Sequence, residues 1–326
     1  MSTPSTLLAA RVKLLQSIAR DIGTPTYVYD LDIIRDKLKT LTQTFAGASL
    51  RYAVKANPSA AVLTELARHG VGAEAITIGE LERALAAGIP AKNIVLGGPA
   101  QDARLRARAL EANVGLVSLD SLSQAETWLA EARLPDCVIR VNPALDPHTH
   151  EHLATGAASS KFGMTVAEAQ QLAPKLGKSL RGFHVHAGSQ IDVPTVYDDI
   201  FNALSPLYEA FPQLDVLDIG GGFAVPNAPL ADMAVRIQDF VKAYGLTLIV
   251  EPGRYVVAEA GTLLTEVLHV KEGARKHVIC SAGMADLLRP ALYGAAHPIQ
   301  LLAEDASTRP QVTADIDGPL CENADR

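Results

Sequence analysis

Between residues 50 and 251 the sequence alternates short apolar runs with longer amphipathic segments, and this alternation constrains the fold more than any other feature. The runs are typical of strands that are buried on both faces, because they lack a polar side for solvent. The segments between them repeat apolar residues at helical spacing. The candidate strands are residues 50–54, 71–76, 93–97, 114–119, 137–142, 182–186, 214–219 and 246–250.

Eight consecutive strand-helix units predict an α/β protein with a closed parallel (β/α)₈ TIM-type barrel, placed at residues 31–257. An open, doubly wound sheet is the alternative. The barrel is favoured because eight is the number of units that closes it, and because no G-x-G-x-x-G motif follows the first strand.

The two ends of the chain differ from this central region. Residues 24–30 (TPTYVYD) predict a strand before the barrel, and residues 1–23 have apolar residues at helical spacing. After residue 257 come further short apolar segments, among them HVICSAG and QVTADIDGPL. We therefore predict a second, mostly β domain built from residues 1–30 and 258–326.

Charge and cysteine content exclude several classes of partner. The formal net charge is −7 with no basic stripe, which argues against nucleic acid. No stretch approaches the roughly 18 apolar residues of a membrane span. Three cysteines without a C-x-x-C pair argue against a disulfide framework and favour a reducing, cytoplasmic location.

Polar residues follow several of the predicted strands, at the barrel end that forms active sites. Lys55 ends the first strand, and His184 and His186 lie two residues apart on the sixth, followed by Gly188 and Ser189. Taken singly, each has an ordinary explanation: a lysine that extends to solvent, or a core histidine that is hydrogen-bonded to the backbone.

The seventh and eighth strands end in DIGGGF and EPGR. Gly220, Gly221 and Gly222 allow close approach of a ligand, and Glu251, Gly253 and Arg254 follow the last strand. A tight turn and a salt bridge are the ordinary explanations. Together, however, an amine, an imidazole, a glycine cradle and a carboxylate are what a pyridoxal phosphate site requires.

His148, His150 and His152 lie close together in PHTHEHLATG, in the loop after the fifth strand. They have the residue type of a metal site, but no cysteine or acid completes a known ligand spacing. A structural role is favoured, and we predict no metal site.

At these residues the chain resembles the alanine-racemase-fold, or group IV, decarboxylases, and most closely the diaminopimelate decarboxylases. The matching segments occur in the family's order: TPTYVYD, YAVKAN, THEHLATG, SKFGM, HVHAGSQI, DIGGGF, EPGR, AGMADLLRPALYG and GPLCENAD. The resemblance implies a barrel joined to a β-sandwich domain and a homodimer with shared active sites. It also implies pyridoxal 5'-phosphate as cofactor and decarboxylation of meso-2,6-diaminopimelate to L-lysine and carbon dioxide, the last step of lysine biosynthesis.

The resemblance also implies roles for single residues in the barrel. Lys55 would bind the cofactor as a Schiff base, His186 would stack on its ring, Ser189 would lie near its phosphate, and Glu251 would pair with its pyridine nitrogen. The phosphate and substrate end of the pocket would comprise Gly221, Gly222, Gly253 and Arg254.

Four residues near the end of the chain match family residues that contact the substrate. Arg289 and Tyr293 of RPALYG would bind a substrate carboxylate. Cys321 would reach across the dimer interface as a proton donor, and Glu322 would recognise the distal ammonium group.

The sequence departs from the family in three places. The segment GAEAITIGEL stands where the family more often has an aspartate-valine pair and a serine, although Glu74 keeps an acid there. Asn323 stands where the family usually has a serine. The chain also ends at Arg326, whereas family members continue, so we expect the β domain to be incomplete at its C-terminus and to lack a family tyrosine.

The alternatives stay open at this point. The chain could be a decarboxylase of the same fold for ornithine, arginine or carboxynorspermidine, or a truncated form that binds pyridoxal phosphate but is catalytically impaired. An amino-acid racemase of this fold would need a tyrosine base opposite the lysine, and here Cys321 occupies the place of that group. A cofactor-carrying homeostasis protein would resemble the barrel alone.

Overall fold

A computed structural model describes residues 4–144, 160–303 and 306–326. It divides the chain into two compact units, and each is described by itself. The first comprises Asp30–Ala260, against the 31–257 predicted for the barrel. The second joins Met1–Tyr29 to Gly261–Arg326, so both ends of the chain contribute to it.

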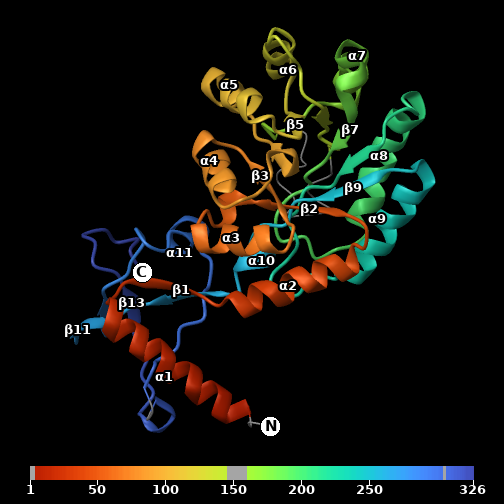
Figure 1. The fold of residues 1–326 in the computed structure, drawn as a ribbon. Helices are drawn as coiled ribbons and strands as arrows, with labels where there is room; N and C mark the ends of the chain where they lie inside the picture. Colours follow the sequence, from red (N-terminus) through yellow and green to blue (C-terminus); the bar gives the residue numbers. More distant parts are fainter. Residues whose placement is uncertain (1–3, 145–159, 304–305) are drawn as a thin grey trace. The chain divides into compact units, whose positions relative to one another are not determined.

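The Asp30–Ala260 unit contains the predicted closed barrel, in which each strand pairs in parallel with the next and the last pairs with the first (Figure 1). Each predicted strand overlaps an observed one, although β2 begins one residue and β7 two residues before the predicted start. The strands are β2 (Ser49–Ala53), β3 (Gly72–Ala75), β4 (Ile94–Leu96), β5 (Leu116–Leu119), β6 (Cys137–Arg140), β7 (Leu180–His184), β8 (Val216–Asp218) and β9 (Thr247–Val250). The prediction of a (β/α)₈ barrel is confirmed, and the open sheet is excluded.

Burial of branched side chains holds the barrel together. Val95, Leu116, Val138 and Ile249, which come from four different strands, form one buried cluster. Each buried aliphatic side chain contributes roughly 1.5–3 kcal/mol relative to exposure. Closure removes every sheet edge, so strands of only three to five residues suffice.

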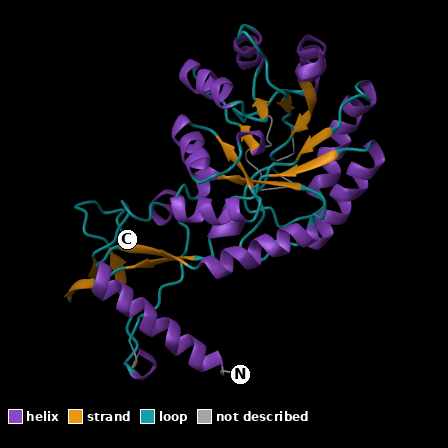
Figure 2. Ribbon diagram, viewed as in Figure 1, coloured by secondary structure: helices purple, strands orange, loops and turns teal. Residues whose placement is uncertain are grey.

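Helices surround the strands (Figure 2). Five of them begin at a residue whose side chain accepts a hydrogen bond from the first turn: Asp30, Thr77, Asp102, Ser121 and Thr165. The helices are α2 (Leu31–Thr44), α3 (Ala60–Arg68), α4 (Ile78–Ala86), α5 (Ala103–Ala112), α6 (Leu122–Leu129), α7 (Val166–Leu176), α8 (Val196–Ala210), α9 (Leu230–Tyr244) and α10 (Arg254–Val257). Short 3₁₀ turns add η1 (Val54–Ala56), η2 (Ala91–Asn93) and η4 (Gly177–Ser179).

The second unit combines two helices with two small sheets. β1 (Thr26–Tyr29) pairs antiparallel with β10 (Gly261–Leu264), which joins the two ends of the chain. A separate sheet has the order β11-β12-β13. Its strands are β11 (Val267–Lys271), β12 (His277–Cys280) and β13 (Asp315–Asp317), and the helices are α1 (Pro4–Ile22) and α11 (Arg289–Tyr293), with the 3₁₀ turn η5 (Ala306–Thr308). Within the described residues, no helix has the length and apolar character needed to cross a membrane.

Candidate active site

Lys55 follows β2 directly, in the turn η1, at the carboxyl end of the barrel. Its Nζ lies 2.7 Å from Oε2 of Glu74, on the neighbouring strand β3. Strand register explains the contact, because Ala53 pairs with Glu74. Burial disfavours the charged lysine, but the carboxylates of Glu74 and Glu251 outweigh that effect, so the pKa of Lys55 lies above its ordinary value.

The two histidines at the end of β7 make different contacts. Nδ1 of His184 lies 2.8 Å from the Ser118 hydroxyl, and the ring is buried. Nδ1 of His186 accepts a hydrogen bond from the Gly221 N–H at 3.3 Å, which places the proton of the neutral ring on Nε2. Burial, together with the charges of Arg140 and Lys55, lowers the pKa of His186 to about 3. The ring is therefore neutral at physiological pH, as stacking on a cationic aromatic ring requires.

Two carboxylates lie buried beside these histidines. Asp218 is completely buried, and Glu251 is only 7% exposed. The Gly220 N–H donates to Oδ1 of Asp218 at 2.8 Å. Burial raises the pKa of Asp218 to about 7, and it raises the pKa of Glu251 well above the ordinary value, with the charges of Asp218 and Glu74 adding to the effect. Each acid therefore loses its proton at a higher pH than an exposed carboxyl does.

Several atoms of this buried cluster have no hydrogen-bond partner among the described residues. They are Oδ2 of Asp218, Oε1 of Glu251, Nε2 of His184 and Nε of Arg51. An unpaired buried oxygen costs about 1–3 kcal/mol unless a ligand supplies a donor. A protonated pyridine nitrogen is such a donor for Glu251, so the residues present fit pyridoxal phosphate.

The same cluster also has features of a metal site. His184, Asp218 and Glu251 offer ligand atoms that all lie within 4.8 Å of one another. However, the guanidinium of Arg51 acts electrostatically on both carboxylates, and a second cation beside them would be repelled. The arrangement therefore favours a proton or a pyridinium over a metal ion.

The buried Asp218 gives a pH prediction. Asp218→Asn is expected to flatten the pH dependence of the free energy of unfolding between about pH 4 and pH 7. In this window the folded protein holds a proton that the unfolded chain releases near 3.8, so stability falls as the pH rises towards 7. Urea unfolding of both proteins over a pH series measures the slope, and an unchanged slope in the variant contradicts the raised pKa.

The glycine turn after β8 packs against the segment that follows β7. Gly220 and Gly222 have φ values of +62° and +90°, which favour glycine. A Cβ on Gly222 would overlap the carbonyl oxygen of Gly188, and the Ile191 N–H donates to the Gly222 carbonyl at 2.8 Å. This backbone contact requires glycine and places two loops of the barrel end together, as a phosphate cradle would need.

A second charged pair stabilises the opposite side of this barrel end. Arg140, at the end of β6, donates to Oδ1 of Asp120 at 2.8 Å, and its guanidinium lies 4.6 Å from the centre of the Phe162 ring. The other carboxylate oxygen accepts from the Gly163 N–H at 3.3 Å. The pair thereby fixes residues 160–164, the SKFGM segment, against the strand ends.

The structure brings some of the predicted residues together and leaves others apart. Lys55 interacts electrostatically with both His186 and Glu251 at one end of the barrel. Ser189 is exposed in the following loop, and Arg254 begins α10. Gly221 donates its N–H to His186, a contact that the sequence did not suggest. The roles of these residues towards a cofactor remain predictions.

The predicted substrate residues lie in the other unit. Arg289 and Tyr293 are on α11, with the guanidinium 5.6 Å from the tyrosine ring centre. Cys321 and Glu322 are both exposed after β13. His148, His150 and His152 lie outside the described residues, as does the THEHLATG segment.

Sequence reasoning overlooked Arg51, Asp120, Arg140 and Asp218, and it assigned no role to His184. The sequence does contain a signal for four of these five residues. Each of them ends or directly follows an apolar strand, as Lys55 does: Asp120, Arg140, His184 and Asp218. Arg51 lies within β2 and is revealed only by its position near the two buried acids.

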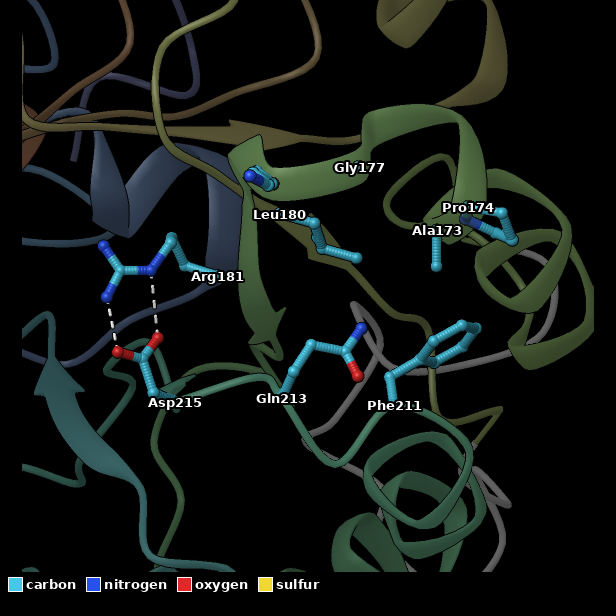
Figure 3. Close-up of a pocket in the computed structure, with 9 residues that line it drawn as sticks. Ala173, Pro174, Gly177, Leu180, Arg181, Phe211, Gln213 and Asp215 are labelled. Carbon is cyan, nitrogen blue, oxygen red and sulfur yellow. Dashed lines mark hydrogen bonds and ion pairs between the residues drawn. The ribbon is translucent and has the colours of Figure 1, made fainter.

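A surface cavity elsewhere on the barrel is shown in Figure 3. It lies at the amino end of β7, where Arg181 donates to Asp215 at 3.0 Å and pairs with Asp136. Because the strand ends that carry Lys55 and Glu251 are the carboxyl ends, this cavity is separate from the candidate active site.

Comparisons with known proteins agree with this geometry. The family model described as the pyridoxal binding domain of pyridoxal-dependent decarboxylases matches residues 31–258. A diaminopimelate decarboxylase of Deinococcus radiodurans is 37% identical over 95% of this chain and 81% of its own length.

Two solved structures are also similar. Diaminopimelate decarboxylase from Helicobacter pylori, complexed with L-lysine, has a TM-score of 0.82 at 34% identity, covering 93% of this chain and 80% of that one. Diaminopimelate decarboxylase from M. jannaschii, in co-complex with L-lysine, has a TM-score of 0.86 at 29% identity, covering 95% of this chain and 78% of that one. With its barrel, its strand-end lysine and its buried acid, the chain belongs to the pyridoxal-dependent decarboxylase family.

Proposed function

We propose that this protein decarboxylates meso-2,6-diaminopimelate to L-lysine and carbon dioxide. The observation that carries the proposal is the likeness to diaminopimelate decarboxylases along 95% of the chain, which is more than the barrel alone. The relatives crystallised with L-lysine support the same product.

The barrel residues have chemistry that suits this reaction. When bound, pyridoxal phosphate supplies the electron sink for the electrons that the departing carboxylate leaves behind. Lys55 offers the amine that holds the cofactor, and Glu74, at 2.7 Å, can accept the proton that this amine must lose. Glu251 would hold a proton at the pyridine nitrogen, and the neutral ring of His186 would pack on the cofactor. The phosphate would be held by Ser189, Arg254 and the glycine turns.

Substrate selection would rest on charge. Arg289 and Tyr293 would bind the carboxylate distal to the reacting carbon, and Glu322 would bind the distal ammonium group. A site built for both charges rejects ornithine and L-lysine, because its own groups would be left unpaired.

The proposal includes a homodimer in the cytoplasm. Cys321 of one copy would serve as proton donor in the site of the other copy, which makes the assembly part of the chemistry. All three cysteines are free thiols, and Cys321 is the exposed one, as its role requires.

The test is a visible absorption spectrum of the purified protein with pyridoxal phosphate, together with a carbon dioxide assay. Meso-diaminopimelate is expected to change the spectrum and release carbon dioxide, whereas L-lysine and ornithine should do neither. Carbon dioxide from ornithine or arginine, with none from diaminopimelate, would assign a different substrate. Binding of the cofactor without carbon dioxide release from any of these amino acids would show an impaired enzyme.

A further inference from the structure

Asp325 is a buried carboxylate outside the barrel that the proposed mechanism does not use. It is 3% exposed, although it lies in a segment whose neighbours are largely exposed. A buried carboxylate must be matched by donors, since desolvation of its charge is costly. The groups that donate hydrogen bonds to Asp325 therefore indicate its role.

The donors to Asp325 are backbone N–H groups from two loops. Oδ1 accepts from the Met284 N–H, and Oδ2 accepts from the Leu320 N–H at 2.8 Å. The backbone carbonyl of Asp325 also accepts from the Gly318 N–H at 2.8 Å. One side chain thus joins residues 283–287 to residues 318–325.

These two loops carry the residues proposed to contact the substrate. The turn at Gly283, closed by hydrogen bonds from the Asp286 and Leu287 N–H groups, leads into α11 with Arg289 and Tyr293. Cys321 and Glu322 lie between Leu320 and Asp325, in a short loop whose base is the Asp325 carboxylate and whose rim is exposed.

Two glycines, Gly283 and Gly318, lie against the same carboxylate. A Cβ on Gly283 or on Gly318 would overlap the oxygens of Asp325. The backbone of both loops therefore lies directly against the Asp325 carboxylate. A side chain at Gly283 or Gly318 would have to displace it. Such packing suits an anchor that holds both loops in one arrangement.

We infer that Asp325 is a positioning residue for the substrate end of the active site. It holds the loop of Cys321 and Glu322 against the turn that leads to Arg289 and Tyr293. This inference rests on the proposed function, because the roles of those four residues are part of it. A misplacement of about 1 Å in such groups can cost on the order of 100-fold in rate.

The experiment compares Asp325→Asn with the unaltered protein, both loaded with pyridoxal phosphate. Asparagine has the same size but offers one acceptor oxygen, so one loop loses its bond. We expect at least 10-fold faster hydrogen exchange at the Met284 or Leu320 amide. We also expect kcat/KM for meso-diaminopimelate to fall by about 10- to 100-fold, with a raised KM, while the cofactor absorption is unchanged.

Gly318→Ala is the second variant, because it displaces the carboxylate without removing it and should reproduce both effects. Asp315→Asn is the matched control. Its carboxylate lies on β13 in the same unit and contacts the exposed Arg275 at 3.4 Å, so exchange at Met284 and Leu320 should not change.

A double variant separates positioning from general destabilisation. If Asp325 acts through Glu322, the combined loss in Asp325→Asn/Glu322→Gln is smaller than the product of the two single losses. Unchanged exchange at both amides, or losses that multiply fully, would overturn the inference. If the unaltered protein fails to decarboxylate diaminopimelate, the proposed function fails, and the exchange measurement still decides whether Asp325 holds the loops.

Discussion

Lys55→Ala is expected to abolish decarboxylation, with a loss on the order of 1,000-fold or more, and to abolish covalent attachment of the cofactor. No other lysine can replace it, because the position of Nζ depends on the end of β2 and on the Glu74 carboxylate 2.7 Å away. The barrel itself should remain folded, since the side chain lies at the strand end and not in the apolar core.

The measurement is borohydride reduction of the protein with pyridoxal phosphate, followed by peptide mass analysis and the carbon dioxide assay. The label should appear on Lys55 in the unaltered protein and be absent from the variant. Lys92→Ala is the matched control, because Lys92 is an exposed lysine on η2, which precedes β4 at the opposite barrel end. A label on Lys92, or full activity of Lys55→Ala, would show that the assignment of Lys55 is wrong.

Glu251→Gln is expected to lower kcat by about 100- to 1,000-fold while covalent attachment of the cofactor to Lys55 persists. Glutamine is neutral, so it cannot hold a proton at a pyridine nitrogen, and the electron sink is weakened. Because a buried glutamate beside Asp218 raises the free energy of the folded state when it ionises, the variant should also unfold at a higher temperature at pH 8.

A loss of activity together with a gain of stability distinguishes this role from a structural one. Thermal unfolding at pH 8 and steady-state kinetics provide the two readouts. Glu111→Gln is a suitable control, since Glu111 is 76% exposed and pairs with Arg108 on the outside of α5. Equal kcat in the Glu251 variant and the unaltered protein would remove Glu251 from the mechanism.

Part of the candidate site could be predicted because local sequence determines it. A polar residue after an apolar run ends a strand, and parallel strands in a barrel bring their carboxyl ends to the same face. Lys55, His186 and Glu251 were found in this way. The glycines after β8 were found too, because the left-handed backbone at Gly220 and Gly222 is a local requirement.

Other features depend on partners that are distant in sequence. Asp120 meets Arg140 only because β5 and β6 are adjacent in the barrel, and Arg51 lies near Asp218 because closure brings the first strand round to the last ones. A sequence pattern contains neither the register nor the burial that sets their charges. The raised pKa of Asp218 and the lowered pKa of His186 follow from desolvation, which exists only in the folded chain.

The sequence alone therefore determined the barrel, the strand-end lysine and the class of chemistry through periodicity and local turns, since these depend on neighbours along the chain. The tertiary structure decided which charges are paired and which carboxyl groups have a raised pKa. It also decided that Asp325, an unremarkable acid in CENAD, is buried between two loops. The physical reason is that burial and hydrogen-bond geometry depend on residues brought together from distant parts of the chain.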